Sequence, residues 1–203
     1  MELHEAINHR SMVRSFAAEP VDPAVIDAIV RSALRAPSAG NTGGTAWLVL
    51  DSPRQTAAYW QATTDHDWRT RSRRSEGLRR APVVLLAYAS AQAYVDRYGE
   101  PDKDDPQLGA TEAAWPVPYW VGDAAFGVMT VLLAAVDAGL GACIVGNFRG
   151  EDALAQALGV PDDWRLFCAV ALGHPDGSDH PSSSLARPLP TPEERIHRGS
   201  WGA

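Results

Sequence analysis

Apolar residues recur at helical spacing between residues 25 and 34, with polar residues between them, and this pattern predicts an amphipathic helix. Asp22 and Pro23 indicate where it begins, because an aspartate accepts the first free backbone N–H groups and proline fits the first helical position. The residue before a proline is disfavoured in a helix, so we expect this helix to end near Ala36, in front of Pro37.

The most apolar part of the chain, residues 120–138, predicts a long helix. Gly139 follows it and suits the left-handed conformation that closes many helices. Its apolar residues cover nearly the whole circumference, so we expect this helix to be buried on every side. We find no apolar run near the ~20 residues that a bilayer span needs, and we therefore expect no membrane segment.

The remaining segments complete an alternation of helices and strands that indicates one α+β domain over residues 1–203. Residues 89–118 predict a helix followed by a long loop rich in Asp and Pro, which is typical of a lid or binding segment. We expect residues 174–192 to cross a surface and residues 193–198 to form a last helical turn. The predicted strands are 47–50, 83–88, 142–145 and 166–172, and the other predicted helices are 3–7, 53–62 and 151–158.

Composition and charge exclude several classes of partner. The chain has 203 residues, 45% of them hydrophobic, and a net charge of −7. Nucleic acids and anionic membranes need basic surface, so we expect neither as a partner. The first residues lack a signal peptide's basic and apolar regions, and we expect a cytoplasmic protein. Cys143 and Cys168 lie in apolar runs and are expected to be buried, and we expect no metal site, because neither cysteines nor histidines have metal-ligand spacing.

Two arginines and a hydroxyl near the start of the chain form a candidate anion site. Arg10, Ser11 and Arg14 lie within five positions. A planar guanidinium and a hydroxyl both suit phosphate oxygens, and a second guanidinium could stabilise another anionic centre on the same ligand. The alternative is a solvated helix end. Two loops with small residues, 37–44 and 143–148, could let a ligand approach the backbone.

Motifs for other cofactors and reactions are missing from the sequence. No GxGxxG follows a predicted strand, and residues 139–141, Gly-Leu-Gly, come after a helix and before a strand, the wrong order for a dinucleotide fold. The chain also has no Walker sequence, no HExxH and no GxSxG.

Four motifs in order resemble those of the nitroreductase family of flavoproteins. Residues 10–16, Arg-Ser-Met-Val-Arg-Ser-Phe, resemble the family's opening RRSxRxF, and residues 35–41, Arg-Ala-Pro-Ser-Ala-Gly-Asn, look like its second signature. Residues 138–141, Ala-Gly-Leu-Gly, are similar to its third, and the tail from Arg187 to Trp201 resembles its last. Together these motifs are specific for the family and do not specify a substrate.

The resemblance implies a central mixed or antiparallel sheet flanked by helices, in an interlocked homodimer whose two FMN sites lie between the subunits. A C-terminal arm, residues 174–203, would reach the partner chain. By carry-over, Arg10, Ser11 and the adjacent Met12 would hold the phosphate end, with Arg187, or alternatively Arg198, completing it. Arg14 would lie near the N1–O2 edge of the flavin and tune its reduction. Pro37, Ser38 and Ala39 would contact the flavin from the partner chain, with Asn41 close by, and Val145 and Gly146 would pass its N5 edge.

Several positions leave alternatives open. One of Arg71, Arg73 and Arg74 could reach the ring edge, or all three could be solvated. Gly43 stands where the family usually has Gln, which puts the substrate side of the pocket in doubt. Residues 115–120, Trp-Pro-Val-Pro-Tyr-Trp, could anchor the long helix or form a wall that stacks on a planar acceptor. Trp60 and Trp68 are expected to be packing residues.

The function that these features favour is transfer of a hydride from NADH or NADPH to FMN, and then of electrons to a flat, electron-poor acceptor such as a nitroaromatic or quinone. One site serving two substrates in turn predicts ping-pong kinetics, with no side chain needed as acid or base. The alternatives are a protein that binds FMN without turnover, or a family enzyme with another outcome, such as flavin destruction, dehalogenation or use of a deazaflavin.

Overall fold

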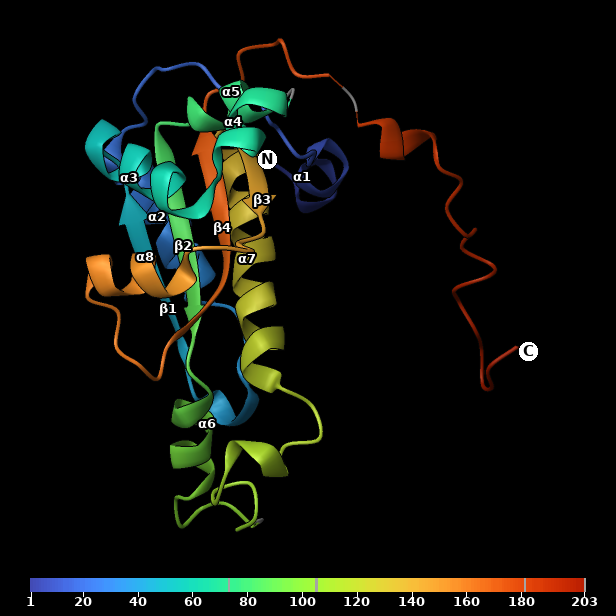
Figure 1. The fold of residues 1–203 in the computed structure, drawn as a ribbon. Helices are drawn as coiled ribbons and strands as arrows, with labels where there is room; N and C mark the ends of the chain where they lie inside the picture. Colours follow the sequence, from blue (N-terminus) through green and yellow to red (C-terminus); the bar gives the residue numbers. More distant parts are fainter. Residues whose placement is uncertain (73, 105, 181, 203) are drawn as a thin grey trace.

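The computed structural model describes residues 1–72, 74–104, 106–180 and 182–202. Its centre is a four-stranded sheet in the order β1-β2-β4-β3, in which every neighbouring pair is antiparallel. Of the two sheet types expected, the structure therefore has the antiparallel one (Figure 1). The strands are β1 (Thr45–Leu50), β2 (Val83–Ala89), β3 (Gly141–Val145) and β4 (Arg165–Gly173).

Helices cover both faces of the sheet. On one face, α2 (Pro23–Ala33) and α7 (Tyr119–Asp137) pack against Val83, Leu85 and Ala87. On the other, α3 (Pro53–Thr63), α5 (Ser75–Arg79) and α8 (Glu151–Leu158) pack against the alternate side chains of β2. Because β2 is covered on both sides, its sequence is a continuous apolar run and not an alternating one. The other elements are α1 (Leu3–His9), α4 (His66–Arg71), α6 (Ala91–Tyr98) and the 3-10 turns η1 (Ala39–Asn41), η2 (Glu112–Ala114) and η3 (Ser183–Ala186).

The predicted helix and strand order is confirmed, with corrections at the ends and in the basic stretch. The Asp22 side chain accepts from the N–H of Ala24, as the predicted start of α2 requires, but α2 ends at Ala33 and not near Ala36. Two short helices, α4 and α5, lie in residues 66–79, for which no element was predicted. Residues 193–195 form a turn and not the expected helical turn over 193–198.

The expectation that α7 is buried on every side was wrong. One face packs into the core, but Val121, Phe126 and Met129 are 39%, 53% and 40% exposed within the single chain. The expectation that no apolar run is long enough for a membrane span was also wrong, because α7 passes that test by length and composition among the described helices. Core helices pass the same test, and α7 packs against α2 and the sheet as a core helix does.

Candidate functional site

The segment after α1 is fixed against the free edge of β3. The N–H of Val13 donates to the carbonyl oxygen of Ala142 at 3.0 Å, and Met12 pairs with Ala142 in a parallel bridge. Because backbone polar groups alternate between the two sides of a strand, those of Ile144 face this same free edge. The arginine motif and the end of β3 are therefore neighbours, as the candidate site requires.

A first hollow, of about 520 Å³, joins Arg10 and Ser11 to the segment that follows β4. Met12 and Arg14 line it as well, opposite Asp179. The structure thus brings together the four residues predicted to hold the phosphate end and tune the ring. Arg187 and Arg198 do not line this hollow: both are exposed, on the C-terminal arm.

A second hollow, of about 600 Å³, lies beside the first and shares Arg14 with it. Val145 and Gly146 line it, so the residues expected at opposite edges of one flavin ring face a common space. Its other walls come from α3, α4, α5 and the segment after β3, including Tyr59, Trp68, Leu78 and Phe148.

Of the three arginines left open by the sequence, Arg74 lines the second hollow, close to Arg14. Arg71 instead pairs with Asp67 at 3.8 Å, and its side chain is 80% exposed. Arg73 lies outside the described residues. Of the two arginines that the structure describes, it therefore favours Arg74 as the one that could reach the ring edge.

Arg14 is positioned through its own backbone and a distant carboxylate. Its Nη1 donates to the carbonyl oxygen of Met12 at 2.9 Å, and its N–H donates to Asp179 Oδ2 at 2.8 Å. The guanidinium and the Asp179 carboxylate both act on the buried thiol of Cys143, with opposite effects on its pKa. Burial is the larger effect and raises that pKa, so the Cys143 thiol stays protonated at neutral pH.

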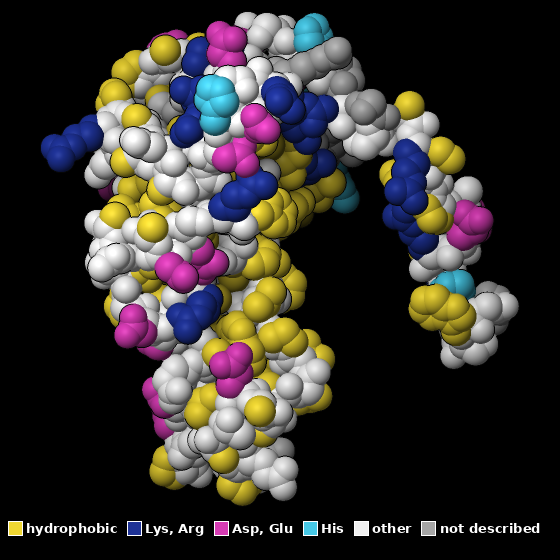
Figure 2. Space-filling view, in the orientation of Figure 1, with side chains coloured by type: hydrophobic (Ala, Val, Ile, Leu, Met, Phe, Trp, Pro, Cys, Tyr) yellow, Lys and Arg dark blue, Asp and Glu magenta, His cyan; other side chains and the backbone are white. Residues whose placement is uncertain are grey.

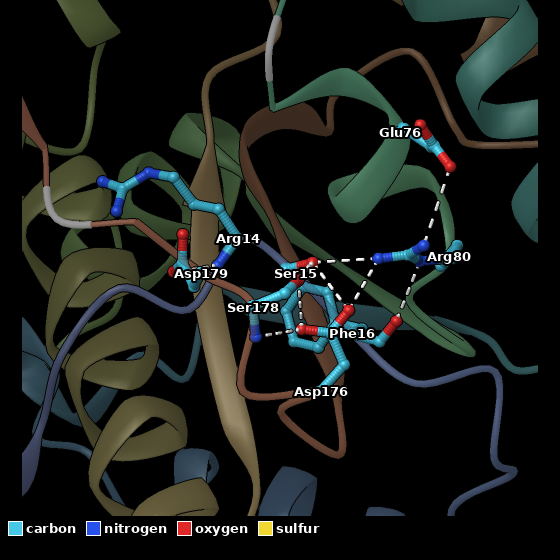
Figure 3. Close-up of polar contacts among 8 residues, drawn as sticks. All are labelled: Arg14, Ser15, Phe16, Glu76, Arg80, Asp176, Ser178 and Asp179. Atoms are coloured by element: carbon cyan, nitrogen blue, oxygen red, sulfur yellow. Dashed lines mark hydrogen bonds and ion pairs between the residues drawn. The ribbon is translucent and has the colours of Figure 1, made fainter.

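The turn that follows Arg14 is held by a polar network that sequence reasoning missed (Figure 3). Ser15 Oγ donates to Asp176 Oδ2 at 2.8 Å, and Arg80 Nη2 donates to the same oxygen at 2.6 Å. Arg80 Nε also donates to the carbonyl oxygen of Phe16 at 3.1 Å. Ser15 and Asp176 are 161 positions apart, and no local pattern signals such a pairing.

This network predicts a loss of stability in acid. The backbone N–H and hydroxyl of Ser178, followed by Ser15 and Arg80, hold the pKa of Asp176 below its usual value. A lowered pKa in the folded state stabilises the protein above the unfolded value of about 3.9 and ceases to do so as the pH falls through the folded value. We expect the free energy of unfolding in urea to fall less between about pH 5 and pH 3 for Asp176→Asn than for the unaltered protein. Asp27→Asn, on the exposed face of α2, is the control, and identical pH curves for all three proteins would contradict the prediction.

A second prediction concerns Gly77 of α5, which allows the helix to lie against Arg14 and Ser15. A Cβ at this position would lie 2.5 Å from the carbonyl oxygen of Arg14 and 2.8 Å from Ser15 Oγ. Overpacking of this kind costs ~1–3 kcal/mol, so Gly77→Ala should lower the free energy of unfolding in urea by about that amount. Glu76→Ala, at an 89% exposed neighbour on the same helix, is the control, and equal stability of the two variants would count against this packing.

The loop of residues 37–41, expected to contact the cofactor, lies far from Arg10 and Ser11 of its own chain. The N–H of Ala39 donates to Asp123 Oδ2 at 2.8 Å, near the start of α7, whereas Met12 pairs beyond the end of that helix. The helix rises ~1.5 Å per residue, so these two anchoring points are about 20 Å apart along it. One chain does not bring residues 37–41 to Arg10 and Ser11. Figure 1 shows the same separation: η1 lies beside α6, far from α1.

Most of the aromatic residues whose role the sequence left undecided are packed against other side chains. Trp115 and Trp120 are 8% and 9% exposed and pack with Tyr94 in one cluster, which supports the anchoring alternative for these two. Trp60 is buried and stacks on Trp68 at 5.7 Å, as expected of packing residues. Cys143 and Cys168 are also buried, as predicted.

Gly43 lies in an exposed turn with φ at 64°, and a Cβ there would meet nothing within 4 Å. Its N–H donates to Ser38 Oγ at 2.9 Å. Glycine in place of the family's usual glutamine at this position therefore leaves the space beside the turn open. Asn41, on the same loop, also has a positive φ, 53°, which asparagine tolerates better than most residues.

Comparisons with known proteins identify the family and the fold of this chain. A family model described as "Nitroreductase family" matches residues 7–174. A curated protein of Archaeoglobus fulgidus, "Putative NADH dehydrogenase/NAD(P)H nitroreductase", is 27% identical over 98% of this chain and 99% of its own. Among solved structures, NfrA2 of B. megaterium matches with a TM-score of 0.74, 19% identity and coverage of 99% of this chain and 76% of its own. An "FMN-dependent Nitroreductase" of Clostridium difficile R20291 matches with a TM-score of 0.66, 17% identity and coverage of 96% and 98%.

Proposed function

The chain belongs to the nitroreductase family, and from this membership we propose that it is a homodimeric, FMN-dependent oxidoreductase. It would take hydride from NADH or NADPH and pass electrons to a flat, electron-poor acceptor such as a nitroaromatic or a quinone. The names of the similar proteins from Archaeoglobus fulgidus and Clostridium difficile support the nicotinamide and the flavin.

The residues around the two hollows fit FMN. Arg10 and Ser11 offer a guanidinium and a hydroxyl, the donors that suit a phosphate. Arg14, between the hollows, offers a positive charge toward a ring that becomes anionic on reduction. Gly146 directly follows β3, and a Cβ there would lie 2.8 Å from the ring of Phe148, so a larger residue at this position would narrow the second hollow.

The roles of these residues follow from their chemistry. Bound FMN supplies the redox chemistry, by accepting a hydride and returning electrons. Arg10 and Ser11 would hold its phosphate, and Arg14 would stabilise negative charge near its N1–O2 edge. Val145 and Gly146 would pass its N5 edge, where a backbone N–H can influence hydride transfer, and Gly146, without a side chain, permits close contact there. The residues of this chain would only bind and orient the flavin and its substrates. None of their side chains would need to act as a general acid or base.

The observation that carries the proposal is the separation of the two halves of the site along α7. Arg10, Ser11 and Arg14 lie beyond its end, and residues 37–41 are anchored near its start. A second copy, packed against α7, would bring its own loop to these arginines. A shared site therefore explains why the two best motifs of the sequence lie far apart within one chain.

An apolar surface along α7 supports the second copy. Figure 2 shows hydrophobic side chains gathered along this helix on the side of the arm, with Lys and Arg side chains above them. Phe126 and Met129 belong to this exposed face, and Phe148, after β3, is 93% exposed. Large exposed apolar patches on a protein are typical of interfaces.

The C-terminal arm supports the same arrangement. Asp176 and Asp179, shortly after β4, still bond to Ser15 and Arg14, but from about residue 182 onward the chain extends away from the body (Figure 1). Leu185, Leu189 and Trp201 on this arm are 76%, 73% and 90% exposed, which favours a role in contacting another chain. Arg187 lies between these apolar residues, so it would reach a phosphate site from the arm and not from the body of the chain. Arg198 remains the alternative.

Anaerobic titration of the FMN-loaded protein with NADH and with NADPH tests the function. We expect the visible flavin absorbance to bleach with one of them and to return on addition of a quinone or nitroaromatic. In separate steady-state assays, we expect the parallel initial-velocity plots of a ping-pong mechanism. A yellow protein that neither nucleotide bleaches would instead favour FMN binding without turnover.

A third prediction concerns assembly. Because the site needs two chains, FMN-loaded protein should sediment as a dimer of the 21.8 kDa chain even at nanomolar concentration. Analytical ultracentrifugation detected at the flavin wavelength measures this directly. A flavin-loaded monomer would contradict the shared site.

A further inference from the structure

A buried carboxyl group of α7 holds the loop of residues 37–41. Asp123 Oδ2 accepts the N–H of Ala39 at 2.8 Å and the hydroxyl of Tyr94 at 2.7 Å. Asp123 is 4% exposed, and Tyr94, on α6, is fully buried. A buried carboxyl is costly unless its oxygens are paired, so these two donors fix the loop, α6 and α7 to one another.

A second anchor lies one residue further along the loop. Arg97 of α6 donates from Nε to the carbonyl oxygen of Gly40 at 3.0 Å. Its two other nitrogens donate to Asp102 at 2.6 and 2.7 Å, so the guanidinium is held in one orientation. This pairing lowers the pKa of Asp102 to about 2, which keeps the carboxylate charged near neutral pH.

The loop also packs closely against α6. Gly40 has φ at 65°, and a Cβ there would lie 2.7 Å from the ring of Tyr98. A Cβ on Gly44 would lie 2.5 Å from the ring of Tyr94. Glycines at both positions let the backbone approach these two rings. The first helix of residues 89–118, the segment expected to be a lid, is thus packed against the loop.

We propose that Tyr94, Arg97 and Asp123 are positioning residues, which hold residues 37–41 in the conformation that contacts the flavin ring of the partner subunit. The inference rests on the proposed function, because it assumes that this loop contacts the ring. The loop that they hold, Pro-Ser-Ala-Gly-Asn at residues 37–41, offers no Lys or Arg to a phosphate, so we expect these three residues to act on the contact with the ring and not on the phosphate. Residues 89–98 are then a support for the site.

The test compares the binding of FMN with that of riboflavin, which lacks the phosphate. Tyr94→Phe and Arg97→Gln should each weaken both ligands by the same factor, roughly tenfold, the equivalent of one lost hydrogen bond to a charged group. Tyr88→Phe is the control and should change neither, because Tyr88 is a buried residue of β2 that packs on the face of the sheet opposite α7. Arg97→Lys retains a donor and should restore part of the affinity.

Two measurements on the apoproteins provide the readout of this test. Fluorescence titration of each apoprotein gives the dissociation constants, and thermal unfolding of the same apoproteins shows whether a loss follows from folding alone. Flavin affinities equal to that of Tyr88→Phe, or a loss for FMN without a loss for riboflavin, would overturn the positioning role. Failure of the unaltered protein to bind either flavin would overturn the proposed function itself, together with this inference.

Discussion

Arg10→Ala should weaken FMN binding by roughly tenfold to a hundredfold, because a hydrogen bond between charged groups contributes about 1.5–3 kcal/mol. Arg10 lines the first hollow beside Ser11, and the described residues around it add no other Lys or Arg except Arg14. Because Arg14 is assigned to the ring, the phosphate would lose the one guanidinium assigned to it among the described residues that line this hollow. Titration of the apoprotein with FMN, followed by flavin fluorescence, measures the loss.

Two comparisons make the Arg10 result specific. Riboflavin should bind equally well to Arg10→Ala and to the unaltered protein, since it has no phosphate. Arg31→Ala, which removes an exposed arginine of α2 outside both hollows, should change neither affinity. Unchanged FMN binding by Arg10→Ala would reject the phosphate assignment.

Arg14→Ala should lower the midpoint potential of bound FMN by roughly 30–60 mV, the two-electron equivalent of about 1.5–3 kcal/mol. The guanidinium lies where the two hollows meet, and its positive charge favours the anionic reduced flavin over the neutral oxidised form. Removing it destabilises the reduced form, so reduction by NADH or NADPH should also slow. Equilibration with a dye of known potential under argon gives the midpoint.

A charge-conserving variant separates electrostatics from shape. Arg14→Lys keeps the positive charge but loses the planar donor that bonds to the Met12 carbonyl oxygen. We expect its midpoint potential to lie closer to that of the unaltered protein than to that of Arg14→Ala. Equal potentials in all three proteins would mean that Arg14 does not lie near the N1–O2 edge.

The order of helices and strands could be predicted because each element carries a local signal. Asp22 and Pro23 mark the start of α2, and Gly139 closes α7 with φ at 72°. The short helices α4 and α5 were missed because residues 66–79 have no clear apolar period and contain five arginines. Their packing on the sheet, through Trp68 and Leu78, stabilises them where local propensity does not.

The motifs of the candidate site could be predicted from the sequence, but the contacts that hold them in place could not. The motif at residues 10–14 and the end of β3 lie together as expected, because Val13 pairs with Ala142. The network of Ser15, Arg80 and Asp176 joins positions far apart in the sequence, and nothing local indicates it. The exposed face of α7 was also misjudged, since composition does not show which faces of an apolar helix pack in the core of its own chain.

The central claim is that each FMN is bound by residues of two copies of this chain, and a mixed dimer tests it most directly. One chain carries Arg10→Ala and Arg14→Ala, and the other carries Pro37→Glu and Asn41→Glu, at two exposed loop positions. Neither homodimer should hold FMN, because both of its sites are damaged. Pairing the two chains leaves one site unaltered and the other damaged from both sides.

We therefore predict that the purified mixed dimer binds one FMN per two chains, measured by flavin absorbance against protein concentration, and that NADH or NADPH reduces it. A mixed dimer without flavin, beside an unaltered dimer that holds two, would contradict the shared site.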